Sequence, residues 1–268
     1  MARRKPHIRA AIITDIHYGF DSGAKLGSKA PRLMRAFEKA VAKYKPDFIL
    51  DMGDRVSTRS MESDTGHMET LQQHFNRMAA PVHHLMGNHD LHYLSRQENE
   101  RITGGSSSSW SSNVGNFHFI FWNPDMQPGA QGWKIGENDL GWLKNNLAQT
   151  DKKTILFSHI PLDHEDKADP NPYEHILSRF HYADSDSIRK ILEDSGNVLL
   201  CMNGHVHRNH HSHINGIHYI SQQSLTQTYQ KHYRVPTGAW SWLEIEDDKI
   251  TVKLQGKVRK DYIIPLAA

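Results

Sequence analysis

Short apolar runs of strand length recur along the chain, and glycine or polar residues follow each one. Runs of four to eight apolar residues bounded by turn formers are typical of buried β-strands. The pattern therefore predicts a sheet-forming chain in which many strands are buried on both faces. The runs that carry the argument below cover residues 10–13, 48–52, 82–86, 154–158 and 198–203.

Between these runs the apolar positions change to helical spacing. After Pro31, the residues Leu33, Phe37 and Val41 recur at intervals of four, which predicts an amphipathic helix that ends before Pro46. A strand, a helix and a second strand in this order predict a β-α-β unit with parallel strands. Similar spacing predicts further helices around residues 71–78, 91–100, 138–148 and 185–195.

The last part of the chain has a different pattern. Residues 211–214 and 217–221 flank Asn215-Gly216, a strong two-residue hairpin signal, and residues 239–246 and 249–254 form a second pair. Parallel units first and antiparallel hairpins last predict an α/β protein with two mixed β-sheets. Irregular segments are expected at residues 55–66, 103–112, 123–136 and 161–182.

Composition narrows the class. A chain of 268 residues suits one domain over residues 1–268, and 32 basic against 30 acidic residues give no basic face for a nucleic-acid polymer. The single cysteine, Cys201, lies in an apolar run, so we expect a buried thiol and no disulfide. No run approaches transmembrane length, and no apolar core of signal-peptide type follows the basic start. We therefore expect a cytoplasmic protein without a membrane partner.

The chemistry is concentrated where the apolar runs end. Gly87 lets the chain turn after residues 82–86, so Asn88, His89 and Asp90 present an amide, an imidazole and a carboxylate at a strand's carboxyl end. Open α/β sheets bind their ligands at that edge. Alone, this tetrapeptide also fits an ordinary turn.

Four other runs end in the same way. Oxygen and imidazole donors of this kind suit first-row divalent metals, and two ions that share one carboxylate need about seven such groups. His205 and His207, two apart on a segment expected to be extended, would share one face. The chain offers seven such candidate ligands: Asp15, His17, Asp54, Asn88, His159, His205 and His207.

The ordered motifs D-x-H, G-D, G-N-H-D, a lone His and G-H-x-H resemble those of the calcineurin-like metallophosphoesterase superfamily, from Asp15 to His207. The resemblance implies a four-layer α/β/β/α sandwich of two mixed sheets flanked by helices. It assigns His89 as the catalytic histidine and Asp90 as the carboxylate that orients it. It also assigns one metal to Asp15, His17, Asp54 and His207, and the other to Asp54, Asn88, His159 and His205.

Such a centre would hydrolyse a P–O bond with a hydroxide that bridges two metal ions. The donors suit Mn or Fe, with Zn or Co as alternatives. Ser57 stands where purple acid phosphatases carry a tyrosine, which disfavours a ferric-tyrosinate site. The motifs are most similar to the branch that cleaves cyclic nucleotides and glycerophosphodiesters. Alternatives are a nucleoside-diphosphate-linked diphosphatase, a phosphomonoesterase, a nuclease or a non-catalytic scaffold.

Three further features each have two interpretations. Arg55, beside Asp54, would either contact a substrate phosphate or form a structural ion pair. Trp110 would either stack on a base or pack at the edge of the core. The histidines near residue 210 favour a structural role over a third metal site, because alternate residues of a strand point to opposite faces. The partner expected is a small phosphoester, and the sequence indicates no oligomeric state.

Overall fold

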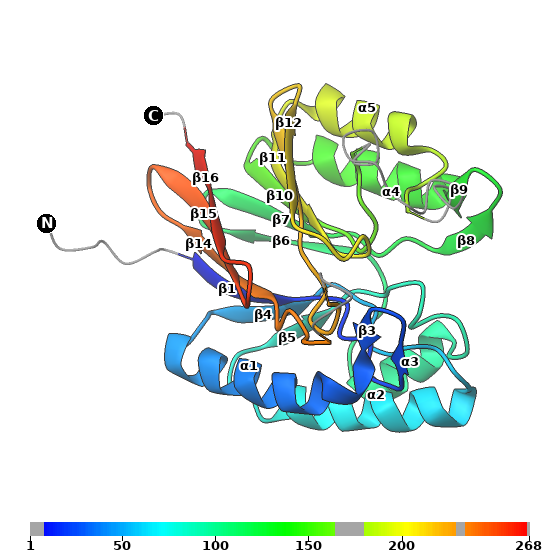
Figure 1. Cartoon of the computed structure of the whole chain (residues 1–268). Coiled ribbons are helices and arrows are strands. Elements are labelled where there is room, and N and C mark those ends of the chain that lie inside the picture. The colour runs from blue at the N-terminus through cyan, green and yellow to red at the C-terminus, as the bar shows by residue number, and fades with distance from the viewer. Residues whose placement is uncertain (1–7, 164–179, 229–233, 267–268) are drawn as a thin grey trace, which may run out of the picture. The chain divides into compact units, whose positions relative to one another are not determined.

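The structure is a computed structural model that describes residues 8–163, 180–228 and 234–266 (Figure 1). The chain divides into two compact units. The first combines the described residues of Met1–Ser107 and Gln222–Ala268, and the second is formed by those of Ser108–Ser221. The expectation of one domain over the whole chain stays a prediction.

The first unit is built on a six-stranded mixed sheet. Strand β1 lies inside it, parallel to β4 on one side and antiparallel to β14 on the other. All residues of β1 except Arg9 are buried, as expected of a strand covered on both faces. In sheet order the strands are β16 (Lys260–Pro265), β15 (Lys249–Gln255), β14 (Trp240–Ile245), β1 (Ile8–Ile13), β4 (Phe48–Asp51) and β5 (Val82–His84).

Two helices, α1 (Ala30–Tyr44) and α2 (Met61–Asn76), lie along one face of this sheet (Figure 1). Helix α1 has a proline in its first turn, and Lys45 closes it in the left-handed conformation with φ 55°. The buried stripe predicted for it is present, and Phe37 packs in one core with Ile13 of β1 and Ile49 of β4. The predicted β-α-β unit is therefore confirmed.

The remaining helices of this unit begin where capping residues place them. The prediction that residues 55–66 are irregular is wrong for the second half, because the Ser60 side chain accepts a hydrogen bond from the Ser63 amide and starts α2. Helix α3 (Arg96–Thr103) begins later than expected, since Ser95 and Glu98 form a capping box. Two short strands, β2 (Asp21–Ser22) and β3 (Lys25–Leu26), and the turn η1 (Gly27–Lys29) were not predicted.

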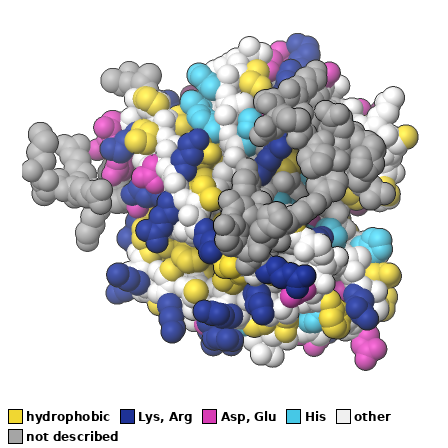
Figure 2. All heavy atoms as spheres, in the orientation of Figure 1, with side chains coloured by type: hydrophobic (Ala, Val, Ile, Leu, Met, Phe, Trp, Pro, Cys, Tyr) yellow, Lys and Arg dark blue, Asp and Glu magenta, His cyan; other side chains and the backbone are white. Residues whose placement is uncertain are grey.

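The outer face of α1 is basic. Arg32, Arg35, Lys39 and Lys43 are all exposed, and their spacing of three and four residues puts them on one side of the helix. Figure 2 shows Lys and Arg side chains gathered over this helix. The nearly balanced charge of the chain thus conceals one basic helix face.

The second unit has its own six-stranded mixed sheet. Strands β7, β10, β11 and β13 are parallel, and an antiparallel strand closes each edge. In sheet order these are β12 (His210–Ile214), β13 (Ile217–Ser221), β11 (Val198–Asn203), β10 (Lys153–Phe157), β7 (Phe117–Phe121) and β6 (Trp110–Val114). Helices α4 (Glu137–Ala148) and α5 (Ser185–Ser195) lie side by side along this sheet (Figure 1).

The hairpin predicted at Asn215-Gly216 is confirmed. Asn215 has φ 50° and Gly216 has φ 87°, the two left-handed residues that a tight two-residue hairpin turn requires. Cys201 is buried in β11 and is a free thiol, as expected, and burial raises its pKa.

Two expected loops of this unit contain strands. Trp110 begins β6, and its ring stacks on that of Phe121 with the centroids 4.0 Å apart, which favours the core-edge interpretation. The loop expected over residues 123–136 forms a hairpin of β8 (Met126–Gly129) and β9 (Gly132–Ile135). Of the loop expected over residues 161–182, residues 164–179 lie outside the described part of the chain.

Each unit thus combines a mixed sheet with helices, which confirms the predicted α/β class with two mixed sheets. Among the described residues, no helix is both long enough and apolar enough to cross a membrane.

Candidate metal centre

Three of the predicted ligands meet in the first unit. Asp15 and His17 follow β1, and Asp54 follows β4, so two parallel neighbours bring their carboxyl ends to one edge of the sheet. Nε2 of His17 lies 3.7 Å from Oδ1 of Asp15 and 3.6 Å from Oδ2 of Asp54. One ligand atom from each residue lies within 4.8 Å of the others, and at most 1% of any of the three is exposed. Buried carboxylates placed so closely need a compensating positive charge.

The backbone at these ligands is strained. Asp15 has φ 51°, His17 has φ 46° and Asp54 has φ 56°, all in the left-handed region. That conformation costs a residue other than glycine about 1–2 kcal/mol, and such residues cluster at functional sites. The amide of Asp15 donates to the carbonyl of Gly53 at 2.9 Å, and that of His17 to the carbonyl of Asp54 at 3.0 Å. These bonds tie the two loops together and hold the strained geometry.

The glycine of the Gly87-Asn88-His89-Asp90 turn is required by close packing. A Cβ added at Gly87 would lie 2.1 Å from Oδ1 of Asp54 and 2.4 Å from its amide nitrogen. The turn therefore approaches the ligand loop at a distance that no side chain allows.

The side chain of Asn88 fits a metal ligand. Its Oδ1 is buried and accepts no hydrogen bond from any residue that the structure describes. A buried acceptor without a donor costs about 1–3 kcal/mol, which a bound cation would offset. Together with the carboxylate and imidazole donors nearby, this atom makes the site suitable for a hard divalent ion.

His89 is held by Thr58, a residue that the sequence did not single out. Oγ1 of Thr58 lies 2.5 Å from Nδ1 of His89, and the His89 amide donates to Oδ1 of Asp54 at 2.8 Å. Thr58 is β-branched, yet its φ is 57°. A left-handed β-branched residue is an outlier, so the surrounding structure imposes this placement.

Asp90 joins the two loops through their backbone amides, and its role in orienting His89 stays a prediction. Its fully buried carboxylate accepts hydrogen bonds from the amides of Gly87 and Asp54, both at 2.9 Å, and of Arg55 at 2.8 Å. These contacts join the 53–55 loop to the 87–90 turn. Within the described chain, then, Thr58 contacts the His89 ring, and Asp90 supports the backbone around it.

Arg55 is fully buried and lies in an ion-pair network. Its Nη2 lies 3.4 Å from Oδ2 of Asp90, and its Nε lies 3.5 Å from Oδ2 of Asp51. Asp51 also contacts Nδ1 of His84 at 2.9 Å. Burial raises the pKa of Asp90, and the Arg55 guanidinium opposes that rise. The structure therefore favours the structural ion pair over contact with a substrate phosphate.

The second unit brings two of the remaining ligands together. His159 follows β10, His205 follows β11, and Nδ1 of His205 lies 3.2 Å from Nε2 of His159. Two imidazole nitrogens facing each other suit a shared cation, because each neutral ring offers one lone pair. The amide of Gly204 donates to the carbonyl of His159 at 3.0 Å and links the two strand ends.

The segment that carries His205 and His207 is not extended as expected. His205 has φ 67° and His207 has φ 56°, so both lie in the left-handed region, and the amide of Val206 donates to the carbonyl of Gly204. The argument that they share one face of a strand is therefore wrong. A tight turn presents them instead.

Comparison with known proteins gives a consistent result. Residues 8–209 match the family model described as calcineurin-like phosphoesterase. A 3',5'-cyclic-nucleotide phosphodiesterase of Nostoc sp. (strain PCC 7120) is 24% identical over 226 residues, which cover 83% of this chain and 80% of that relative.

Two solved structures show the same fold. A dimetal phosphatase from Danio rerio matches with a TM-score of 0.80 at 16% identity, over 98% of this chain and all of that chain. GAP50, the anchor in the inner membrane complex of Plasmodium, matches with a TM-score of 0.63 at 14% identity, over 97% and 89% of the two chains. Likeness at this level of identity concerns the fold alone, because one fold carries different functions.

Proposed function

The chain belongs to the calcineurin-like phosphoesterase family and is a metal-dependent phosphoester hydrolase, and from this premise we propose that it cleaves small phosphodiesters. The substrates would be of the cyclic-nucleotide or glycerophosphodiester type. The similarity to a cyclic-nucleotide phosphodiesterase supports the diester class.

The observation that carries the proposal is the buried cluster of Asp15, His17 and Asp54 on strained backbone. We propose that it acts with Asn88, His159, His205 and His207 to bind two divalent ions, with Asp54 shared between them. The order of the motifs along the chain supports this set. Mn or Fe is the proposed metal, with Zn or Co as alternatives, since every donor is nitrogen or oxygen.

When bound, two such ions make a water acidic enough to supply hydroxide near neutral pH and neutralise the phosphoryl oxygens. The chain's own residues add orientation and proton control. The ring of His89, fixed by Thr58, would donate a hydrogen bond to the phosphoryl or leaving oxygen. Asp90 would keep the 87–90 turn against the 53–55 loop, so that Asn88 and Asp54 hold their positions.

The proposal includes a small-molecule phosphoester as the partner, and neither a membrane nor a nucleic-acid polymer. A cytoplasmic location is also part of the proposal, because free buried thiols such as that of Cys201 are usual there.

The test is a substrate panel assayed on metal-stripped protein reloaded with one metal at a time. Mn, Fe(II), Co, Zn and Mg would each be combined with phosphomonoesters, cyclic nucleotides, glycerophosphodiesters, nucleoside diphosphate esters and an oligonucleotide. We expect the highest kcat/KM for a small diester with Mn or Fe(II). A higher kcat/KM for monoesters, diphosphates or the oligonucleotide would contradict the diester proposal while leaving the hydrolase class intact.

A further inference from the structure

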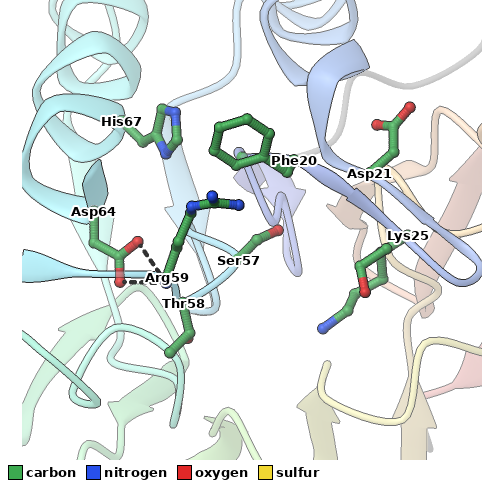
Figure 3. Close-up of a pocket in the computed structure, with 10 residues that line it drawn as sticks. Phe20, Asp21, Lys25, Ser57, Thr58, Arg59, Asp64 and His67 are labelled. Atoms are coloured by element: carbon green, nitrogen blue, oxygen red, sulfur yellow. Dashed lines mark hydrogen bonds between the residues drawn. The ribbon is translucent and has the colours of Figure 1, made fainter.

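A cavity of about 300 Å³ opens in the first unit (Figure 3). Its size is at the lower end of the range for small-molecule sites, about 300–1,000 Å³. Its lining comes from the segment between β1 and η1, which includes β2 and β3, from the loop after β4 and from α2. Among the lining residues are Phe20, Lys25, Ser57, Thr58, Arg59 and His67.

One wall of the cavity is an exposed aromatic ring paired with a cation. Phe20 is 58% exposed, although it is a large apolar residue. The guanidinium carbon of Arg59 lies 4.1 Å from the centre of the Phe20 ring, and the His67 ring meets it edge-on at 6.5 Å. Figure 3 shows the side chains of Arg59 and Phe20 converging. A phenyl ring and a guanidinium plane left open to solvent form a surface on which a flat aromatic group can stack.

The two acids and the two cations of the lining, Asp21, Asp64, Lys25 and Arg59, differ in how they are bonded. The carboxylate of Asp21 points away from the cavity and accepts a hydrogen bond from the Ser28 amide at 3.0 Å (Figure 3). The carboxylate of Asp64 accepts from the Arg59 amide at 3.1 and 3.3 Å. Both acids are thus bonded to backbone amides, whereas Lys25 and Arg59 carry their charge on long side chains. Among the described residues, no carboxylate lies within ion-pair distance of either cation.

The cavity adjoins the candidate catalytic residues of the same unit. Thr58, which contacts the His89 ring, is part of its lining. Ser57, also in the lining, donates to the carbonyl of His17 at 2.6 Å. Burial lowers the pKa of Lys25, and the nearby carboxylates of Asp54 and Asp15 oppose that change. The cavity therefore lies beside the candidate metal ligands, and the Phe20–Arg59 pair is part of the same lining.

We infer that this cavity binds the nucleobase side of a nucleoside phosphodiester, with the base stacked on Phe20 and Arg59 and Lys25 directed toward the phosphate. The inference rests on the proposed function and narrows it. A glycerol group is not planar and gains nothing from stacking, so the cavity selects nucleosides over glycerophosphodiesters. Stacking of one base on an aromatic residue is worth about 5- to 100-fold in binding.

The experiment compares four variants with the parent, all loaded with Mn. Phe20→Leu removes the ring and keeps an apolar side chain, Phe20→Tyr keeps the ring, and Arg59→Ala removes the cation. Arg35→Ala, an exposed arginine on α1 outside the cavity, is the matched control. For each protein, kcat/KM is measured with adenosine 3',5'-cyclic phosphate and with glycerophosphoethanolamine, and the Kd of adenosine 5'-monophosphate by calorimetry.

We expect Phe20→Leu to lower kcat/KM for the cyclic nucleotide by about 5- to 100-fold and to leave the value for glycerophosphoethanolamine unchanged. Phe20→Tyr and Arg35→Ala should behave like the parent, and Arg59→Ala should weaken nucleotide use in the same direction as Phe20→Leu. Equal losses on both substrates, or no loss on the nucleotide, would overturn the inference.

The calorimetric measurement separates this inference from the proposed function. If the parent hydrolyses no diester, yet Phe20→Leu weakens binding of adenosine 5'-monophosphate by 5-fold or more, the base site stands and the diester proposal fails. If the parent and Phe20→Leu bind the nucleotide equally, or if the parent does not bind it, the base site fails whatever the diester assay shows.

Discussion

At the scale of single residues, Asp54 is the side chain on which most contacts of the candidate centre converge. Its Oδ1 accepts from the His89 amide, its Oδ2 faces the His17 ring, and its own amide donates to Asp90. Its backbone is left-handed, and its carbonyl accepts a hydrogen bond from the His17 amide. A change at this position therefore affects both the donors and the geometry that holds them.

We predict that Asp54→Ala lowers the metal content of the purified protein more than any other single ligand change. Asp54 is the one residue proposed to contact both ions, so its loss removes a donor from each. Elemental analysis after gel filtration measures the effect, with the exposed Asp21→Ala as the control that should keep its metal. Two tightly bound ions per chain in Asp54→Ala would show that the ligand assignment is wrong.

A second prediction concerns His89→Ala, which should keep the metals and the fold. Its ring is proposed to help the departing oxygen, and donation of this kind is worth about 10²–10⁴ in rate. The loss of rate should be large for an alkyl or ribosyl diester. It should be small for a p-nitrophenyl diester, because p-nitrophenolate is a weak base and leaves without a proton donor. Kinetics on both substrates give the comparison. Similar losses of rate on both diesters would indicate that the His89 ring contacts the phosphoryl oxygens. Loss of metal from His89→Ala would indicate that His89 is a metal ligand.

The sequence indicated the candidate donors more clearly than the residues that support them. Asp15, Asp54 and Asn88 stand out because each follows an apolar run, and strand ends are where side chains meet. Thr58 and Asp90 were harder to interpret, since their partners are set by how two loops fold back on each other. Asp90 bonds to three backbone amides, which no side-chain motif encodes. Asp51, a charge inside an apolar run, was the available clue to the ion pair with Arg55.

At the scale of elements, continuous apolar runs predicted the buried strands, and turn residues predicted the hairpin strands β12 to β15. Burial on both faces demands such runs, so β1, β4, β10 and β11 were visible in the sequence. Edge strand β6 was not, because its partly exposed Trp-Ser-Ser-Asn-Val sequence resembles a loop and is ordered by pairing with β7. The start of α2 depends on the Ser60 cap and the start of α3 on the Ser95–Glu98 capping box, which periodicity does not show.

The β12–β13 hairpin carries a group of histidines with a predicted effect on acid stability. Burial, followed by the nearby charges of His213 and His211, lowers the pKa of His218 to about 4, and its ring stacks on theirs. The unfolded chain then binds more protons than the folded chain between about pH 6.5 and pH 4. The free energy of unfolding should therefore fall as the pH drops through that window. Above the window, His218 should not affect it.

Urea unfolding at pH 7.5 and pH 5 measures this prediction. His218→Gln should narrow the difference in the free energy of unfolding between the two pH values, because its side chain takes up no proton. The same change at His92, an exposed residue outside the hairpin, serves as the control. A pH dependence that His218→Gln leaves unaltered would assign the acid sensitivity to other groups.

At the scale of the whole molecule, metal binding should be linked to folding. The unfolded chain does not hold Asp15, His17 and Asp54 together. An ion that binds only the folded site therefore stabilises the folded protein. At a free metal concentration 100 times the Kd, the stabilisation is about 2.7 kcal/mol. Calorimetric scans with increasing Mn should show a rising Tm for the parent and a flat one for Asp54→Ala. If the Tm of the parent does not change with Mn although its activity requires Mn, the metal site is not preformed in the folded protein.

The sheet of the first unit pairs strands that lie far apart in the sequence, because β14 is hydrogen-bonded to β1. On the ribosome, β1 is therefore made long before its partner. Until β14 emerges, one edge of β1 offers unpaired amides and carbonyls beside an apolar face, a template on which another nascent chain can add a strand. Residues 108–221 are complete before then, so the second unit can fold while the first still waits. A chaperone that shields strand edges would be needed mainly during that interval.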